Sequence, residues 1–368
     1  MAPRLTLILT FLLITFAATA TESAREFFKF AKFSFEEGEY QKAMSYVNQA
    51  IAIESTYSSA YFLRAEICLK LGNYKLAKED ASRIIDTEAT TSALTSNSYL
   101  LRGVAYFYLN QYKASLSDLI ACVNVEPDNA RAYYFTGLIH MNNSALFPAL
   151  ENFDNAIKHD QQQAEYYYYR AEVKADLFKP IPGTPTYDEI MADIQSAQDL
   201  DAADYRSYEL KCKMLRLNAE QQREVYLAEL DKTIVLFPAQ AEFYGQRGMA
   251  QVLDYKFVAA LDDFSMAMKL SGPDESLLRN RALCYHNLGQ YHYALKDYNE
   301  SIELMIKVFQ ETDDKTAKNR LAETLVMRGR TFEAAGQPDN ACDDFYNAAK
   351  LGSKNGLNNY RRNCNVYQ

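Results

Sequence analysis

Small, aromatic and polar positions recur along this chain with a period close to 34 residues. The motif Gly38-x-Tyr40-x-x-Ala43 returns as Gly72-x-Tyr74-x-x-Ala77 and as Gly289-x-Tyr291-x-x-Ala294, and with Pro in place of Tyr as Gly336-x-Pro338-x-x-Ala341. Apolar residues at helical spacing lie on both sides of each motif, and Gly readily takes the left-handed conformation that ends a helix. Each period therefore predicts two helices joined by a tight turn, and the chain predicts a tandem array of such hairpins.

Two further positions recur in phase with the turn. Small residues recur in the first predicted helix, where the two helices would cross: Ala31, Ala65, Gly103, Gly137, Ala171, Gly248, Ala282 and Gly329. Larger apolar residues recur in the second helix: Val47, Leu119, Phe153, Ile194, Phe264, Tyr298 and Phe345. One hairpin cannot bury such a stripe alone, so neighbouring hairpins are expected to share a continuous core.

A pair of opposite charges follows the same period. Six times an Arg in the first helix precedes an Asp in the second, by sixteen residues in five cases and by twenty-three in the Arg170 case, where a Pro-rich insert intervenes. The pairs are Arg64 with Asp80, Arg102 with Asp118, Arg170 with Asp193, Arg247 with Asp263, Arg281 with Asp297 and Arg328 with Asp344. Because both partners are absent together at Phe30/Tyr46 and Thr136/Asn152, we predict structural ion pairs that clamp two helices.

These positions together resemble the tetratricopeptide repeat (TPR), a 34-residue helix–turn–helix unit. The resemblance covers residues 24–353 and implies an all-α fold, a right-handed α-solenoid of about nine TPR units, with a C-terminal capping helix and tail at 354–368. The expected units are 24–57, 58–95, 96–129, 130–163, 164–203, 204–240, 241–274, 275–321 and 322–353. The unit at 204–240 departs most from the pattern, since it lacks the turn Gly. It carries Lys211 and Glu229 in place of the Arg–Asp pair.

The N-terminus predicts export. Arg4 precedes an apolar stretch from Leu5 to about Ala17, and Ala18-Thr19-Ala20 offers small residues before a cut near Thr21. The stretch is shorter than the ~20 residues that span a bilayer, so we expect a signal peptide at 1–20 and no integral membrane span in the mature chain. The closing segment around Cys342 and Gly352 resembles the ending of exported repeat proteins of Bacteroidetes-type bacteria. The expected location is the periplasm or the extracellular medium.

An exported protein can hold disulfides, and the chain has six Cys. Cys342 lies near the start of the last repeat's second helix, and Cys364 near the end of the terminal helix. A turn around Gly352–Gly356 folds one helix onto the other, and the two arms are about 12 and 13 Å long at the helical rise. We therefore predict a Cys342–Cys364 disulfide. Cys68, Cys122, Cys212 and Cys284 fall at helix-facing positions and are expected to be buried free thiols.

Composition excludes several functions. The net charge is −9, which disfavours nucleic acid, because phosphate binding needs clustered Lys and Arg. The four His residues are never at a metal-ligand spacing of i, i+4, and there is no phosphate loop or nucleophile elbow. We expect no enzymatic activity, no metal site and no cofactor.

The concave face of the array is the predicted partner groove. The first helices are expected to line it, with these inner positions: Phe62, Leu100, Phe107, Tyr134, Met141, Tyr168, Met249, Arg279 and His286. Aromatic side chains provide contact area at low entropic cost, which suits an extended peptide. In the run Tyr166–Tyr169, Tyr167 is expected in the core and Tyr168 in the groove. The Lys and Asn with which related co-chaperones grip acidic chaperone tails are replaced here by Phe62 and Glu66, so the resemblance disfavours that ligand at this place.

The leading interpretation is a non-catalytic scaffold of the cell envelope that binds an extended protein or peptide segment. One alternative is a glycan-binding helical-repeat protein, although those usually carry a lipid-anchoring Cys and large inserts, which are lacking here. Another is a co-chaperone of eukaryotic secretory compartments, whose family ends in a J domain with a His-Pro-Asp motif that this chain lacks. Sequence alone indicates neither the partner nor the oligomeric state.

Overall fold

The computed structural model describes residues 23–87, 93–179, 181, 183–217, 219–312 and 315–364. Every regular element in these ranges is a helix, as the TPR-like pattern predicts. The predicted signal peptide at 1–20 and the last residues of the predicted tail lie outside the described residues.

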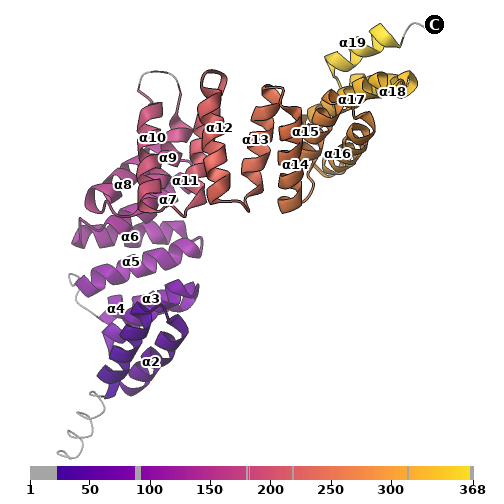
Figure 1. Cartoon of the computed structure of the whole chain (residues 1–368). Coiled ribbons are helices and arrows are strands. Elements are labelled where there is room, and N and C mark those ends of the chain that lie inside the picture. Colours follow the sequence, from indigo (N-terminus) through magenta and orange to yellow (C-terminus); the bar gives the residue numbers. More distant parts are fainter. Residues whose placement is uncertain are drawn as a thin grey trace, which may run out of the picture. The chain divides into compact units, whose positions relative to one another are not determined.

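The helices come in consecutive antiparallel pairs (Figure 1). A helix over residues 23–36 is followed by α2 (Tyr40–Ile53), α3 (Ser58–Lys70), α4 (Tyr74–Thr87), α5 (Ala93–Tyr108), α6 (Tyr112–Val125), α7 (Ala130–Asn142), α8 (Leu146–His159), α9 (Ala164–Leu177), α10 (Tyr187–Leu200), α11 (Tyr205–Leu217), α12 (Ala219–Leu236), α13 (Ala241–Leu253), α14 (Phe257–Ser271), α15 (Glu275–Asn287), α16 (Tyr291–Thr312), α17 (Lys315–Ala334), α18 (Pro338–Lys350) and α19 (Lys354–Asn363). From α3 onward, odd-numbered helices are the first and even-numbered helices the second of each hairpin, and α19 follows the last hairpin.

The chain divides into two compact units, one ending at Ser207 and the other beginning at Tyr208. Within each unit the core is a chain of small clusters, each shared by adjacent helices. One cluster joins Val47 of α2 to Leu63 of α3, and another joins Leu119 of α6 to Phe135 of α7. Burial is therefore local in sequence, as stacked two-helix repeats require.

The recurring small residue faces the recurring aromatic residue sixteen positions later. A Cβ atom added to Gly248 would lie 2.8 Å from the ring of Phe264, and one added to Gly329 would lie 2.6 Å from the ring of Phe345. Both Phe rings are fully buried. The missing side chain of the first helix thus leaves room for the ring of the second helix, which explains why the two positions recur together.

The residue after the first helix has a left-handed backbone, with φ of +75° at Gly72 and +74° at Gly289. In the α13–α14 hairpin the same place is taken by Tyr255, with φ of 60° and a side chain that is 81% exposed. A bulky residue in this conformation carries backbone strain. The turn geometry is therefore kept even where the sequence does not favour it.

Candidate functional site

The six Arg–Asp pairs are present as two-pronged ion pairs. In each pair Nε and Nη2 of the Arg donate to the two carboxylate oxygens of the Asp, as in Arg102 with Asp118 at 2.7 and 2.9 Å. The remaining five pairs have the same geometry. The Asp side chains are almost completely buried, and burial raises the pKa of Asp80, although Arg64 opposes that rise. These ion pairs connect the two helices of a hairpin, so their charged groups are not available to a ligand.

Five of the Arg residues also bind a third helix, which the sequence spacing did not predict. Arg247 Nη1 donates to Asp231 of the preceding hairpin at 2.6 Å, and Arg64 Nη1 donates to Asn48 at 2.8 Å. Arg102, Arg170 and Arg328 make equivalent bonds to Ser82, Asp154 and Asn299. Each of these five guanidinium groups therefore joins successive repeats as well as the two helices of its own hairpin.

An aromatic ring accompanies every one of the six Arg residues. Tyr61 lies 5.3 Å from the guanidinium carbon of Arg64, and Tyr99, Tyr167 and Tyr244 take the same place before Arg102, Arg170 and Arg247. Where the residue three before the Arg is Leu, as at Leu278 and Leu325, the ring comes four residues after the Arg: Tyr285 beside Arg281 and Phe332 beside Arg328. The Tyr three residues before each of the other four Arg residues thus acts as its cation–π partner.

The three hairpins without an Arg–Asp pair have other contacts at the same two positions. Phe30 and Tyr46 form an aromatic contact with ring centroids 5.6 Å apart. Thr136 and Asn152 each bond a backbone carbonyl four residues earlier in their own helix. Lys211 and Glu229 form a salt bridge at 3.1 Å. The clamp can therefore be replaced by apolar or self-satisfied residues without loss of the hairpin.

In the first unit, the predicted groove residues lie mainly within the packing. Leu100 is buried, and Phe107 and Tyr134 pack against its cluster. Phe62 and Met141 pack against two other clusters. Burial strongly raises the pKa of Tyr134, whose ring contacts Phe135, Phe153, Tyr166 and Tyr169.

The Tyr run lies partly within the packing. Tyr166 is the buried ring. Tyr167, expected in the core, is half-buried: it packs against the cluster of Ala156, Ile157 and Tyr166, and Arg170 lies over its ring. Tyr168 is half-buried beneath the guanidinium of Arg206, 4.8 Å from its ring centroid.

In the second unit, two of the three predicted groove residues line a common pocket. The pocket has a volume of ≈ 840 Å³ and is lined mainly by α13 and α15, with further residues from α11, α12 and α14. Met249, which is 43% exposed, and Arg279 both line it. The first helices of three successive hairpins, α11, α13 and α15, thus contribute to one hollow surface.

A hydrogen-bonded chain fixes one wall of this pocket. The Tyr226 hydroxyl donates to Gln246 Oε1 at 2.9 Å, and Gln246 Nε2 donates to Glu242 Oε1 at 2.9 Å. Arg223 Nη1 donates to Asp254 at 2.7 Å, and this contact lowers the pKa of Asp254. The polar groups are therefore held in place before any ligand arrives, which reduces the entropic cost of binding.

His286 does not join the pocket. Thr331 donates its hydroxyl hydrogen to the carbonyl of Met327, so His286 Nδ1–H donates to Thr331 Oγ1 at 3.0 Å. Burial and the charge of Arg330 lower the pKa of His286, which favours the neutral ring. Its contact with Thr331 ties α15 to α17.

The sequence missed Arg216 and Arg223, which also line the pocket. Both lie in the repeat at 204–240, which resembles the family least, and α12 has a non-helical residue, Gln222 (φ −133°, ψ 38°), next to Arg223. The departure of this repeat from the family pattern is the signal that could have indicated them. Where the packing pattern is not kept, other side chains can face the pocket.

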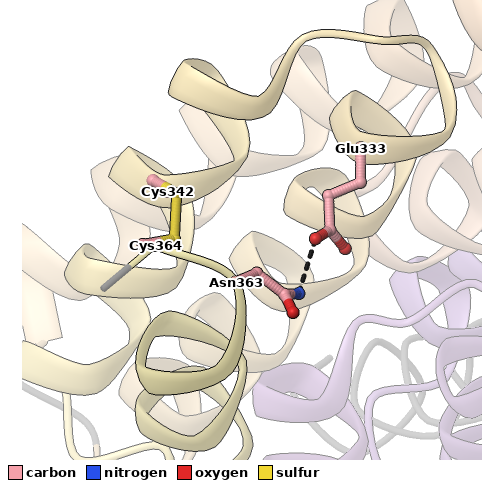
Figure 2. Close-up of a disulfide and its surroundings, with 4 residues drawn as sticks. All are labelled: Glu333, Cys342, Asn363 and Cys364. Atoms are coloured by element: carbon pink, nitrogen blue, oxygen red, sulfur yellow. Dashed lines mark hydrogen bonds between the residues drawn. A yellow bond between two sulfur atoms is a disulfide. The ribbon is translucent and has the colours of Figure 1, made fainter. Parts of the chain in front are cut away.

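The last helix is attached to the final hairpin by a covalent bond and a polar contact (Figure 2). Cys342 of α18 and Cys364, just after α19, form the predicted disulfide, with Cα atoms 5.7 Å apart. Asn363 donates to Glu333 of α17. Gly356 lies so close to α18 that an added Cβ would be 2.7 Å from Ala348 Cβ. The other four Cys are buried free thiols, as expected.

The described residues contain no cluster of His, Cys, Asp and Glu that could hold a metal ion. Over the same ranges, no helix is both long enough and apolar enough to cross a bilayer. The pocket in the second unit offers guanidinium groups, carboxylates, amides and apolar surface, which suit ligand binding.

Comparison with known proteins supports the repeat assignment. Tetratricopeptide repeat family models match residues 58–89, 96–129 and 281–311. The chain contains tetratricopeptide repeats. It is 24% identical over 312 residues to the human mitochondrial import receptor subunit TOM70, covering 82% of this chain and 51% of the receptor. This TPR chain therefore spans about half the length of that relative.

Two solved structures have folds similar to that of this chain. PilF of Pseudomonas aeruginosa matches with a TM-score of 0.51 and 14% identity, covering 61% of this chain and 96% of PilF. A chain of the APC/C hetero-tetramer Cut9-Hcn1 matches with a TM-score of 0.50 and 14% identity, covering 80% of this chain and 54% of the other. At these identities the likeness concerns the fold alone.

Proposed function

We propose that this TPR protein is a non-catalytic interaction scaffold that binds an extended protein segment across its first helices. The observation that carries the proposal is the pocket of ≈ 840 Å³ lined by α11, α13 and α15. Its size suits several side chains of a bound peptide. Met249 and Leu253 expose apolar surface there, at 43% and 57%.

The structural role of the six Arg–Asp pairs supports the same proposal. The six Arg–Asp pairs are used in joining helices, so they offer neither acid–base chemistry nor ligand contacts. TOM70 is named as a receptor subunit, so that relative works in a protein assembly. The proposal extends this general role, and not the partners of TOM70, to this chain.

We further propose that the protein acts outside the cytoplasm, in the cell envelope of a Bacteroidetes-type bacterium or in its surroundings. The apolar N-terminal stretch supports export, and the Cys342–Cys364 disulfide suits an oxidising compartment. N-terminal sequencing of the mature protein should find a start near Thr21. An intact Met1 on protein purified from the native host would contradict this proposal.

A photo-crosslinking amino acid at Met249 tests the scaffold role. In the native host, we expect it to capture one recurrent protein, identified by mass spectrometry. The same amino acid at Val258, which is 62% exposed on the second helix α14, is the control. A synthetic peptide from the captured protein should bind purified scaffold, and binding should fall in a Met249→Glu/Leu253→Glu variant. Equal capture from both positions, or a peptide indifferent to the variant, would refute the proposal.

A further inference from the structure

The pocket of the second unit has more positively than negatively charged side chains in its lining. Three Arg side chains line it, Arg216, Arg223 and Arg279, against the two acidic side chains Glu242 and Asp274. The whole chain carries a net charge of −9. A local excess of guanidinium groups in an acidic protein is therefore a feature of this pocket and not of the composition.

The two carboxylates of the pocket already accept hydrogen bonds from the protein itself. Asp274 caps α15, and its Oδ1 accepts from the backbone N–H groups of Ser276 and Leu277 at 2.7 and 2.9 Å. Glu242 accepts from Gln246 at 2.9 Å. An Asp at the N-terminus of a helix is also stabilised by the helix dipole. Both carboxylates are thus held by donors of the protein's own chain.

The Arg side chains of the pocket have fewer ion pairs and hydrogen bonds than the six repeat Arg residues. No described residue forms an ion pair or hydrogen bond with Arg216 or Arg279, whereas the six repeat Arg residues are all paired. Arg223 is paired with Asp254 through Nη1, but its Nε is buried with no hydrogen-bond partner. A buried donor without an acceptor costs free energy, which an anionic ligand would recover.

Apolar surface surrounds these donors. Met249, Leu253, Leu277 and Gly245 line the same pocket. Guanidinium groups beside apolar side chains match an acidic side chain with apolar neighbours. The lining from three successive hairpins suits a segment that runs across helices, and hence an extended one.

We propose, resting on the scaffold function above, that this pocket binds an extended protein segment in which an Asp or Glu is flanked by apolar residues. Arg216 and Arg279 contact the carboxylate, and Met249 and Leu253 contact the flanking side chains. The place differs from the Phe62 and Glu66 positions, where the sequence disfavours an acidic ligand. The recognition chemistry is a carboxylate bound by guanidinium donors within an apolar rim.

Two synthetic peptide pools test this inference by fluorescence anisotropy on the full chain. One pool has a fixed Leu-Glu-Leu-Glu-Leu centre with degenerate flanks, and the other has Gln in place of Glu. We expect the Glu pool to bind at least tenfold more tightly and to weaken as salt rises. In Arg216→Gln/Arg279→Gln, affinity for the Glu pool should fall about tenfold, since partly exposed charge pairs contribute modestly. The Gln pool should be unaffected.

The matched control is Arg361→Gln/Arg362→Gln, which removes the same charge from exposed positions on α19 and should leave binding unchanged. Equal binding of the two pools, loss of affinity in the control, or no binding of the Glu pool would each overturn the inference. The photo-crosslinking result is independent of these outcomes. A partner captured at Met249 together with equal pools refutes the acidic preference alone, whereas no capture refutes the scaffold.

Discussion

At the scale of single residues, the repeating Arg is defined by what it joins. Its guanidinium contacts an Asp on its own second helix, usually an acceptor on the preceding hairpin, and a neighbouring ring, as Arg102 does with Asp118, Ser82 and Tyr99. Arg can satisfy all three because it has five donors in a plane with two faces. Lys could supply neither the fork nor the stacking.

Removing one partner of such a pair should therefore cost more than removing both. Arg102→Met leaves Asp118, which is 6% exposed, as an unpaired buried carboxylate, and we expect a loss of about 3 kcal/mol in unfolding free energy. Arg102→Met/Asp118→Leu should recover most of it, because no buried charge remains. Urea denaturation of the two variants and of the parent measures the difference. Equal stability of the single and double variants would contradict a structural role for the pair.

The cysteines give a second residue-scale prediction. Burial raises the pKa of Cys68 and Cys122 to about 11, and of Cys212 and Cys284 to about 12, so thiolate is scarce at pH 8. We expect a thiol reagent to label none of them quickly in the native protein. Four thiols should react after denaturation, and six after denaturation with reduction. Six reactive thiols without a reductant would show that the disulfide is absent.

At the scale of helices, the hairpin follows from complementary volumes at two positions. Gly248 has no room for a Cβ, which would lie 2.8 Å from the Phe264 ring. At Gly245, one turn earlier on α13, an added Cβ would make an ordinary contact with Leu277 at 3.5 Å. Two glycines of one helix thus differ in what surrounds them.

This difference predicts opposite effects of the same substitution. Gly248→Ala should lower the unfolding free energy by about 2 kcal/mol, because the ring of Phe264 is fully buried and must shift. Gly245→Ala should be neutral or raise it by up to about 1 kcal/mol, since Ala favours helix. Thermal unfolding followed by circular dichroism compares them. A Gly248→Ala variant as stable as Gly245→Ala would show that the close approach is not rigid.

Most of the hairpins were predictable because they repeat the same few constraints. The small position, the turn and the second-helix aromatic recur, so weak signals add across the chain. Arg216 and Arg223 were not predictable in this way, because they lie in the hairpin that departs from the repeat. The groove residues Leu100, Phe107 and Tyr134 follow the helix period correctly, yet lie within packing. The period indicates a face but not how deeply neighbouring helices cover it.

At the scale of the whole molecule, we expect stability to be a sum of contributions from each hairpin and from its contacts with neighbouring hairpins. Each core cluster is shared by adjacent helices, and the five three-way Arg contacts reach only the preceding hairpin. The array therefore needs protection where it ends. At the C-terminus, α19 covers α18 and is attached to it by the disulfide, with polar residues such as Arg361 and Arg362 on the exposed side.

Loss of the disulfide should consequently be felt near the end of the chain and little elsewhere. Cys342→Ser/Cys364→Ser removes a link across 22 residues, which is about 3 kcal/mol in the chain-entropy model. Hydrogen exchange followed by mass spectrometry should show faster exchange in α18 and α19, a smaller change in α17, and none in α3–α8. Reduction of the parent protein should reproduce the same map, which controls for the new serines. Uniformly faster exchange along the chain would mean that the repeats unfold as one cooperative body, and the account of stability by neighbouring hairpins would then be wrong.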